Sequence, residues 1–249
     1  MKTLALVIPC HNEFHRLRQD AFLKAIDAYG GLSLCFVDDG STDATAETLA
    51  HLANQSPAIH VLYLPQNVGK AEAVRTGINY LCANSHADLV GFWDADLATP
   101  LDEIADFLCA FSGSHDIDAV IGSRWPHLGA SITRTFTRSC TGAIMKCLLR
   151  LVLRAPVYDT QCGAKIFTRE LAHEIFAAPF STHWLFDVEL LRRIGPDRLQ
   201  SNTCELPLQN WRDVPGSKIS GLDSLKIIGE LIRLARTIPP TWDKTPLSV

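Results

Sequence analysis

The segment Val37-Asp38-Asp39-Gly40-Ser41-Thr42-Asp43 gives the clearest indication of the fold class. It closes an apolar run from Leu32 to Val37, which is too short for a helix and predicts a buried strand. Gly40 indicates a turn, and the apolar spacing from Ala44 to Ala53 predicts a helix after it. Two carboxylates therefore stand where the chain leaves a strand for a helix.

The same alternation of short apolar runs and amphipathic stretches continues on both sides of this motif. Further strands are predicted at Leu4 to Pro9, Ile59 to Leu64, Leu89 to Trp93 and Ala119 to Gly122, and further helices at Phe14 to Tyr29, Lys70 to Ala83 and Leu101 to Phe111. This pattern is typical of a mostly parallel sheet flanked by helices, with ligands at the carboxyl ends of the strands. After about residue 124 longer helical stretches predict a helical C-terminal part with few strands.

A second acidic motif, Phe92-Trp93-Asp94-Ala95-Asp96, follows a later predicted strand. Alternate residues of an extended backbone share one face, so the carboxylates of Asp94 and Asp96 can point at one site. Mg²⁺ prefers oxygen ligands and commonly combines one or two carboxylates with phosphate oxygens of a substrate. The expected proximity of Asp94 and Asp96 to Asp38 and Asp39 favours such a site. Asp38 and Asp39 could instead only fill the turn in which they stand.

Composition excludes other classes of protein. Hydrophobic residues make up 47% of the 249 residues and charged residues 20%, which predicts a folded globular protein. The net charge of -4 and the pI near 6.1 lack the positive footprint of a nucleic-acid binder, so we expect no nucleic-acid partner. Eight cysteines are scattered without a CxxC pair and are expected to be free thiols.

No segment has the pattern of a signal peptide or a membrane span. The apolar run from Leu4 to Pro9 has no small-residue cleavage site behind it, and no run approaches about 20 apolar residues. We therefore expect a cytoplasmic protein. The stretches Gly142 to Ala155 and Leu222 to Arg236 place basic residues beside an apolar face. This favours peripheral contact with the cytoplasmic face of a membrane, or else packing on the sheet or in a homodimer.

Four motifs in order resemble those of the family 2 inverting glycosyltransferases: Val7-Ile8-Pro9-Cys10-His11-Asn12-Glu13, Val37-Asp38-Asp39-Gly40-Ser41-Thr42-Asp43, Asn67-Val68-Gly69-Lys70-Ala71 and Asp94-Ala95-Asp96. Three later motifs resemble the dolichyl- and polyprenyl-phosphate β-glucosyltransferase branch: Gly122-Ser123-Arg124, Asp159-Thr160-Gln161-Cys162-Gly163-Ala164-Lys165 and Phe186-Asp187-Val188-Glu189. The resemblance spans roughly residues 4–220. It implies the GT-A fold, an α/β fold with a Rossmann-like, mostly parallel sheet.

The resemblance also implies how functions divide along the chain. Residues 1–236 would form a single glycosyltransferase domain, with a nucleotide-sugar-binding half at 1–124 and an acceptor-side half at 125–236, and residues 237–249 would form an extended tail. The nucleotide-diphosphate sugar would be bound by Pro9, Glu13, Asp38, Asp39, Lys70 and Asp94. Asp96, together with Asp94, would bind Mg²⁺ or Mn²⁺.

The acceptor side carries the remaining candidates. Phosphate contacts are expected from Arg124, Arg134, Arg138 and Lys165. The catalytic candidates are Asp94, Asp96, Arg124, Asp159 and Glu189. Arg134 and Arg138 could instead form a solvated helix face, and Glu189 could only orient a neighbouring cation. If the acceptor were a hydroxyl, the base would be Asp159, Asp187 or Glu189.

The expected function is inverting transfer of a hexose, glucose from UDP-glucose, to a polyprenyl or dolichyl phosphate. A phosphate monoester is already ionised near neutral pH and needs no strong base. One alternative is transfer to a sugar hydroxyl of a polysaccharide or glycolipid, although the Gln-x-x-Arg-Trp motif of such enzymes is absent. Another is a non-catalytic nucleotide-sugar-binding protein. A nucleotidyltransferase is disfavoured because Pro9 to Glu13 contains neither glycine nor lysine.

Overall fold

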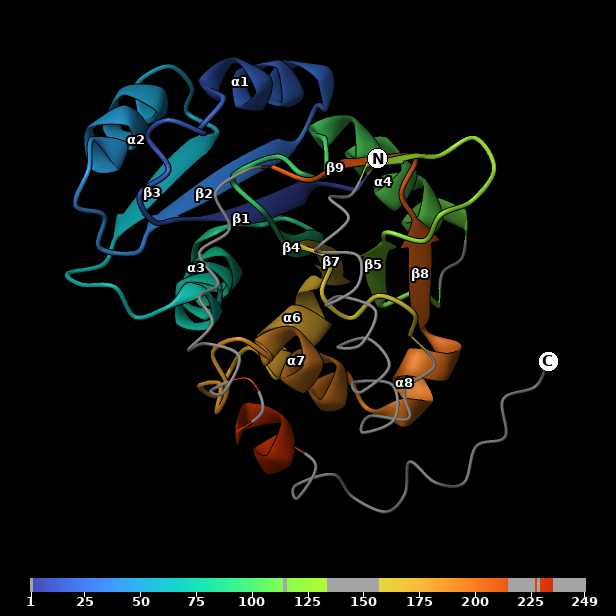
Figure 1. Cartoon of the computed structure of the whole chain (residues 1–249). Helices are drawn as coiled ribbons and strands as arrows, with labels where there is room; N and C mark the ends of the chain where they lie inside the picture. The colour runs from blue at the N-terminus through green and yellow to red at the C-terminus, as the bar shows by residue number, and fades with distance from the viewer. Residues whose placement is uncertain (1, 114–115, 134–156, 215–226, 228, 235–249) are drawn as a thin grey trace.

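A seven-stranded sheet forms the middle of the molecule in the computed structural model, which describes residues 2–113, 116–133, 157–214, 227 and 229–234 (Figure 1). The strand order is β3-β2-β1-β4-β7-β5-β8. The strands are β1 (Leu4–Cys10), β2 (Leu32–Asp38), β3 (Ile59–Tyr63), β4 (Leu89–Trp93), β5 (Ala119–Ser123), β7 (Ala164–Thr168) and β8 (Thr203–Pro207). Only β7 runs antiparallel to its neighbours, β4 and β5. Two short strands, β6 (Ser131–Thr133) and β9 (Asn210–Arg212), pair in parallel beside this sheet.

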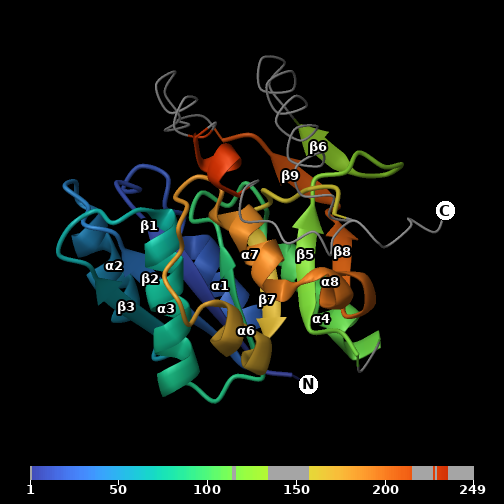
Figure 2. The same ribbon diagram turned by 90° about the horizontal axis from the view of Figure 1, so that it is seen from below.

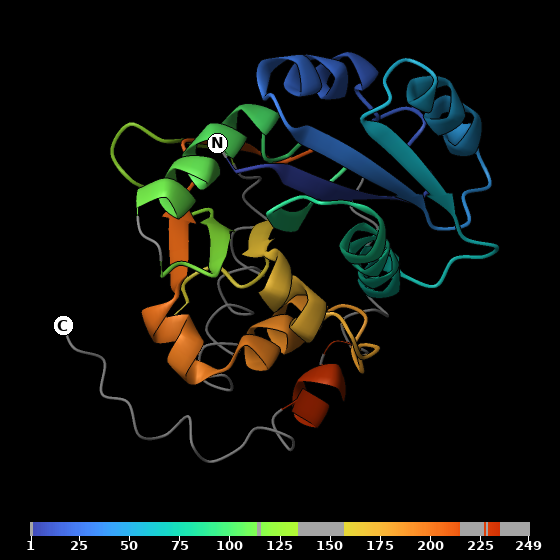
Figure 3. The ribbon, with the colours of Figure 1, turned by 180° about the vertical axis from the view of Figure 1, so that it is seen from behind.

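Helices cover both faces of the sheet (Figures 1 and 3). One layer holds α1 (Gln19–Ala28), α2 (Thr45–Ala53) and α4 (Ile104–Gly113), which continues the 3₁₀ turn η1 (Leu101–Glu103). The other holds α3 (Lys70–Asn84), α6 (Arg169–Ile175), α7 (Phe186–Ile194) and α8 (Pro196–Ser201). Side chains of β1 alternate between the layers: Leu6 packs in one core with Phe22, and Val7 packs in the other with Val74.

The predicted GT-A-type architecture is confirmed, since all five predicted strands are present and their sheet is mostly parallel. The first predicted helix begins too early, because α1 starts at Gln19. The preceding residues form turns instead, in which the amides of Arg16 and Leu17 donate to the carbonyl of Glu13.

The prediction of few strands after residue 124 was wrong, because β6, β7, β8 and β9 all follow it. The central strand β7 is only five residues long and carries Lys165 among apolar residues, which obscures its pattern. The expected helical C-terminal part is present in α6, α7 and α8, between and around these strands.

The loops that matter for function gather at one edge of the sheet, the upper edge in Figure 2. The parallel strands β1, β2, β4 and β5 all end there, and the antiparallel strand β7 begins there. Within the described residues, none of the helices has the length and hydropathy that crossing a membrane requires. Six of the cysteines are described, and each is a free thiol.

Candidate active site

The acids after β4 lie beside a lysine from the start of α3. Lys70 Nζ donates to Asp94 Oδ1 at 2.5 Å, and both side chains are partly exposed. Desolvation lowers the pKa of Lys70, but the charges of Asp94 and Asp187 outweigh it and raise that pKa. Burial and the nearby charge of Asp94 raise the pKa of Asp96, against the opposing charges of Arg16 and Lys70. The contact of Lys70 with Asp94 brings the start of α3 beside the acids that follow β4.

Asp94 is held by the segment that precedes β7. Its backbone N–H donates to the carbonyl of Gly163 at 3.0 Å. A Cβ atom at Gly163 would lie 1.8 Å from Asp94 Oδ2, so the carboxylate occupies the space that a side chain would fill. Glycine is required here for close approach, which explains the glycine in the Asp159 to Lys165 motif.

The donor set of Asp94 and Asp96 fits a divalent cation. Two neighbouring carboxylates, one with a raised pKa, form a concentration of negative charge that a cation would relieve. Among the residues that the structure describes, no three His, Cys, Asp or Glu side chains are grouped as metal ligands. Mg²⁺ typically uses one or two carboxylates together with substrate phosphate oxygens, so two acids are enough for that type of site.

The acids after β2 reach the same edge but differ in their surroundings. Asp38 and Asp39 are buried, at 4% and 3% exposure. The Asp39 carboxylate accepts from the amides of Val68 and Gly69, at 2.7 and 2.9 Å, so it fixes the loop that leads into α3. Asp38 Oδ1 accepts from the amide of Ser41 at 3.2 Å. The contact of Asp38 with Ser41 fits the alternative that this acid fills its turn, whereas Asp39 holds a different loop.

The two candidates from β1 lie next to these acids. Pro9 pairs with Val37 across β1 and β2, one residue before the acids. Glu13 is buried in the loop after β1, where Arg16 donates to its Oε1 at 2.5 Å and its amide donates to Thr45 Oγ1. Both residues therefore lie at the edge where the nucleotide was expected.

Arg124, directly after β5, forms a fork with Asp159. Its Nε and Nη2 atoms donate to Asp159 Oδ2 and Oδ1 at 2.6 and 2.7 Å, and its backbone N–H also donates to Oδ2. Asp159 is fully buried. Desolvation lowers the pKa of Arg124, but the hydrogen bonds and charge of Asp159 outweigh it, so the guanidinium stays charged. The Arg124 guanidinium also lies 5.4 Å from the Trp211 ring.

Two candidates occupy positions that do not support the predicted roles. Lys165 is fully buried and hydrogen-bonded to Asp187, so its nitrogen is not available to contact a phosphate. Glu189 accepts from the amides and hydroxyls of Ser181 and Thr182 and from Arg193, which leaves it holding a loop. The contact of Glu189 with Arg193 agrees with the alternative that Glu189 orients a neighbouring cationic side chain. Arg134, Arg138, the stretch Gly142 to Ala155 and the tail 237–249 lie outside the described residues.

Sequence reasoning missed two acids that shape the site. Glu205, at β8, accepts from the amides of Tyr158 and Asp159 at 2.8 and 2.7 Å. Glu230 accepts from three consecutive amides of residues 183–185. Neither acid stands in a motif, and their partners are more than 40 residues away in the chain, so no local signal reveals them.

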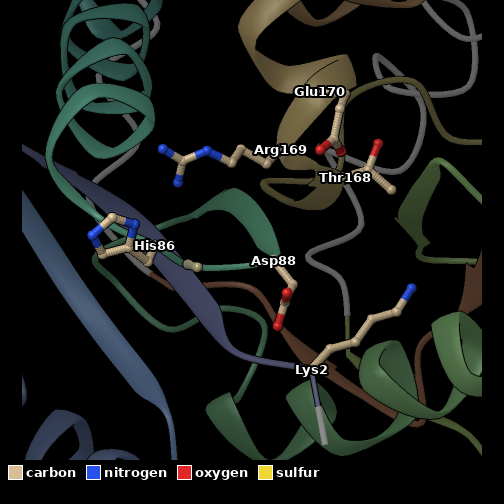
Figure 4. A pocket seen from close by; sticks show the side chains of 7 residues that line it. Lys2, His86, Asp88, Thr168, Arg169 and Glu170 are labelled. Carbon is tan, nitrogen blue, oxygen red and sulfur yellow. The ribbon is translucent and has the colours of Figure 1, made fainter.

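A pocket of about 460 Å³ at the opposite edge of the sheet does not belong to this site (Figure 4). Its lining includes Lys2, His86, Asp88, Arg169 and Glu170. Several of these groups already have structural partners: Arg169 donates to the carbonyls that end α3, and Asp88 accepts from the backbone and hydroxyl of Thr3. In α/β sheets, ligands bind at the carboxyl ends of strands, so the acidic edge is the better candidate.

The sheet order and the acids after β2 and β4 define an α/β domain of the GT-A type. The sequence model of glycosyl transferase family 2 matches residues 5–176, and the chain belongs to that family.

Relatives within the family are similar along most of this chain. It is 32% identical over 243 residues to a dolichyl-phosphate beta-glucosyltransferase of Trichomonas vaginalis, covering 93% of this chain and 72% of that protein. It is 30% identical to the dolichyl-phosphate beta-glucosyltransferase of Saccharomyces cerevisiae, and this match covers 92% of this chain and 73% of that protein. A second such protein of T. vaginalis is 34% identical, and the match covers 80% of this chain but only 58% of the relative. The chain thus spans less than two thirds of that relative's length.

Solved structures share the fold. Glucosyl-3-phosphoglycerate synthase of Mycobacterium tuberculosis in complex with Mn²⁺, UDP and phosphoglyceric acid superposes with a TM-score of 0.66 at 21% identity, over 96% of this chain and 80% of that one. The structure of the same enzyme with Mg²⁺ and UDP superposes with a TM-score of 0.66 at 19% identity, over 96% of this chain and 81% of that one. At this level of identity the likeness shows the GT-A fold.

Proposed function

We propose that this chain transfers glucose from UDP-glucose to a polyprenyl or dolichyl phosphate, with inversion at the anomeric carbon. The observation that carries the proposal is the convergence of Asp94, Asp96 and Lys70 at the strand edge that also holds the fork of Arg124 and Asp159. The relatives named dolichyl-phosphate beta-glucosyltransferase support this choice of donor sugar and acceptor.

The donor would lie across the ends of β1, β2 and β4. Asp38 and Glu13 would contact the nucleoside, and Lys70 would bind near the diphosphate. Asp96 with Asp94 would hold Mg²⁺ or Mn²⁺, which neutralises the charge that grows on the departing nucleotide. The M. tuberculosis enzyme of the same fold was crystallised with UDP and either metal, which supports this arrangement.

The surroundings of the candidate bases favour a phosphate acceptor. A sugar hydroxyl needs a base to remove its proton, whereas an ionised phosphate does not. Asp159 is fully buried in its fork with Arg124, and Glu189 is engaged by the loop at Ser181. Asp187 is bonded to the buried Lys165. Each acid is thus committed to a contact that a base would have to give up, which disfavours a hydroxyl acceptor.

The loop after Arg124 suits an acceptor that carries a lipid chain. Trp125 is 45% exposed and packs against Tyr158 with tilted ring planes, at 58° and with ring centroids 3.8 Å apart, and Leu128 is fully exposed. Aromatic and aliphatic side chains of this kind partition into the interface of a bilayer. We therefore place the working site at a membrane surface, reached by peripheral contact.

A transfer assay tests the proposal. The purified chain is incubated with polyprenyl phosphate, Mg²⁺ or Mn²⁺, and a panel of labelled UDP- and GDP-sugars. We expect an organic-soluble, acid-labile product from UDP-glucose that requires the divalent cation. Label that enters only water-soluble glycans would contradict the lipid acceptor, and UDP binding without transfer to any acceptor would indicate a non-catalytic binding protein.

A further inference from the structure

A buried ion pair lies behind the candidate site, between β7 and α7. Lys165 is fully buried, and its Nζ donates to Asp187 Oδ1 at 2.5 Å and to the carbonyl of Cys162 at 2.6 Å. Asp187 lies in the first turn of α7 and is 5% exposed. Buried opposite charges need each other, since removal of either leaves a charge without compensation in the interior.

The first connection from this pair to the candidate site runs through the segment 159–163. Cys162, whose carbonyl Lys165 holds, stands between the two functional contacts of that segment. At one end Asp159 binds Arg124. At the other, Gly163 accepts from the amide of Asp94 and leaves room for its carboxylate. Lys165 therefore fixes the middle of a segment whose ends place both groups.

The second connection runs through Lys70. Lys70 donates to Asp94, and Lys165 donates to Asp187, which follows Phe186 at the start of α7. Two aromatic rings connect these ion pairs: the Lys70 nitrogen lies 5.9 Å from the centroid of Phe186, and the Lys165 nitrogen lies 5.4 Å from that of Phe92. The two rings pack against each other at 5.8 Å. A shift at Asp187 would thus reach Asp94 by a second path.

We propose that Lys165 and Asp187 are a positioning pair, which sets the places of Asp94 and Asp159 so that the site can bind a metal-nucleotide complex. The inference rests on the proposed function, because it assigns the pair a task in binding the UDP moiety with its cation. It replaces the expectation that Lys165 contacts phosphate itself. The pair acts through Cys162 and Lys70 and touches no substrate.

A double variant separates this role from a purely structural one. Each single substitution leaves a buried charge alone and threatens folding, but apolar residues of similar volume often replace a buried ion pair without loss of stability. Lys165→Met combined with Asp187→Val removes both charges together. We expect its melting temperature to stay within about 4 °C of the wild type.

The readout is UDP affinity measured by calorimetry with and without Mn²⁺. In the wild type Mn²⁺ should strengthen UDP binding. In the double variant we expect the UDP affinity without metal to stay within about twofold of the wild-type value. The factor by which Mn²⁺ strengthens UDP binding, which we call the gain from Mn²⁺, should fall at least tenfold, because Asp94 is no longer held in place. A folded double variant that keeps the wild-type gain from Mn²⁺ would overturn the proposal.

Two further proteins complete the test. Leu199→Ala truncates a core residue of α8 and controls for lost stability, so it should keep the gain from Mn²⁺. Lys165→Gln combined with Asp187→Asn serves if the apolar double variant does not fold, with the same expected loss. A wild-type chain that shows the Mn²⁺ effect but transfers no glucose would count against the proposed function alone.

Discussion

At the scale of single residues, the proposed metal ligand Asp96 lies in surroundings that disfavour its charge. Burial and the charge of Asp94 raise the pKa of Asp96 in the folded chain. Between the ordinary carboxyl pKa and this raised value, the folded state binds more protons than the unfolded state. Stability of the metal-free protein therefore falls as pH rises through that window. A site that gathers negative charge for a cation has this consequence.

The substitution Asp96→Asn tests both the effect of this charge on stability and the proposed role of Asp96 as a metal ligand. It removes the charge and keeps the size, so the metal-free variant should melt at a higher temperature than the wild type at pH 7, and the difference should shrink toward pH 4. Transfer should fall about 100-fold or more, because the expected cation loses a ligand. Calorimetric melts over a pH series and the transfer assay check both parts. A variant that melts lower at pH 7 and keeps full activity would contradict this assignment.

Gly163→Ala tests the placement of Asp94. The backbone of Gly163 is outside the positive-φ region, so alanine adds no backbone strain, but its Cβ would meet Asp94 Oδ2. The carboxylate must therefore turn away, and we expect transfer to fall about 100-fold with little change in the melting temperature. Gly113→Ala is the matched control, because a Cβ there meets nothing within 4 Å. Equal activity of the two variants would show that Asp94 does not need its observed position.

At the scale of elements, buried and half-buried acids organise the loops around the site. A buried backbone N–H needs a partner, and loops lack the ladders that provide one in sheets. Here single carboxylates accept from two or three neighbouring amides, as observed for Asp39, Glu103, Glu189, Glu205 and Glu230. These contacts connect loops to distant elements and hold the site in one arrangement.

Glu205→Gln tests one of these contacts. A neutral amide keeps one accepting oxygen in place of two, so either the Tyr158 or the Asp159 amide loses its acceptor. We expect a loss of about 1–3 kcal/mol in the free energy of unfolding and weaker transfer, because Asp159 no longer meets Arg124 in the same place. Denaturant unfolding and the transfer assay measure these effects. Unchanged values in both would exclude a role of Glu205 in the site.

The same contacts mark the limit of prediction from sequence. Strands β1 to β5 are predictable because each is a short apolar run between helical patterns. The place of β7 cannot be predicted from the sequence, because this strand enters the sheet between β4 and β5 from a later part of the chain. It also carries the buried Lys165, which breaks its apolar pattern. Asp39 and Glu189 stand out as carboxylates in motifs, but their amide donors are visible only in three dimensions.

At the scale of the whole molecule, large apolar side chains are exposed on the loops around the site. Phe14 follows β1, Tyr63 ends β3, and Trp125 and Leu128 follow β5, all at the carboxyl edge of the sheet. The pocket at the opposite edge is lined mainly by polar and charged residues. Contact with a lipid surface through the site edge agrees with this distribution and with the proposed lipid acceptor.

Leu128→Asp tests contact with the membrane. The side chain is fully exposed, so the substitution should leave the fold intact. Transfer to an acceptor embedded in phosphatidylcholine vesicles should fall about tenfold, because a charge replaces an apolar side chain at the interface. Transfer to a short-chain acceptor in free solution should stay the same. An equal loss with both acceptors, or no loss with either, would contradict the proposed peripheral contact.

The position of a bound metal ion and nucleotide would show whether Asp94 and Asp96 form the metal site. Crystals of the chain soaked with UDP and Mn²⁺ would reveal the cation by its anomalous signal. We predict one peak within about 2.5 Å of a carboxylate oxygen of Asp96, bridged to the diphosphate, with the uracil near Asp38. A cation and nucleotide bound elsewhere, such as in the pocket of Lys2 and Arg169, would contradict the account.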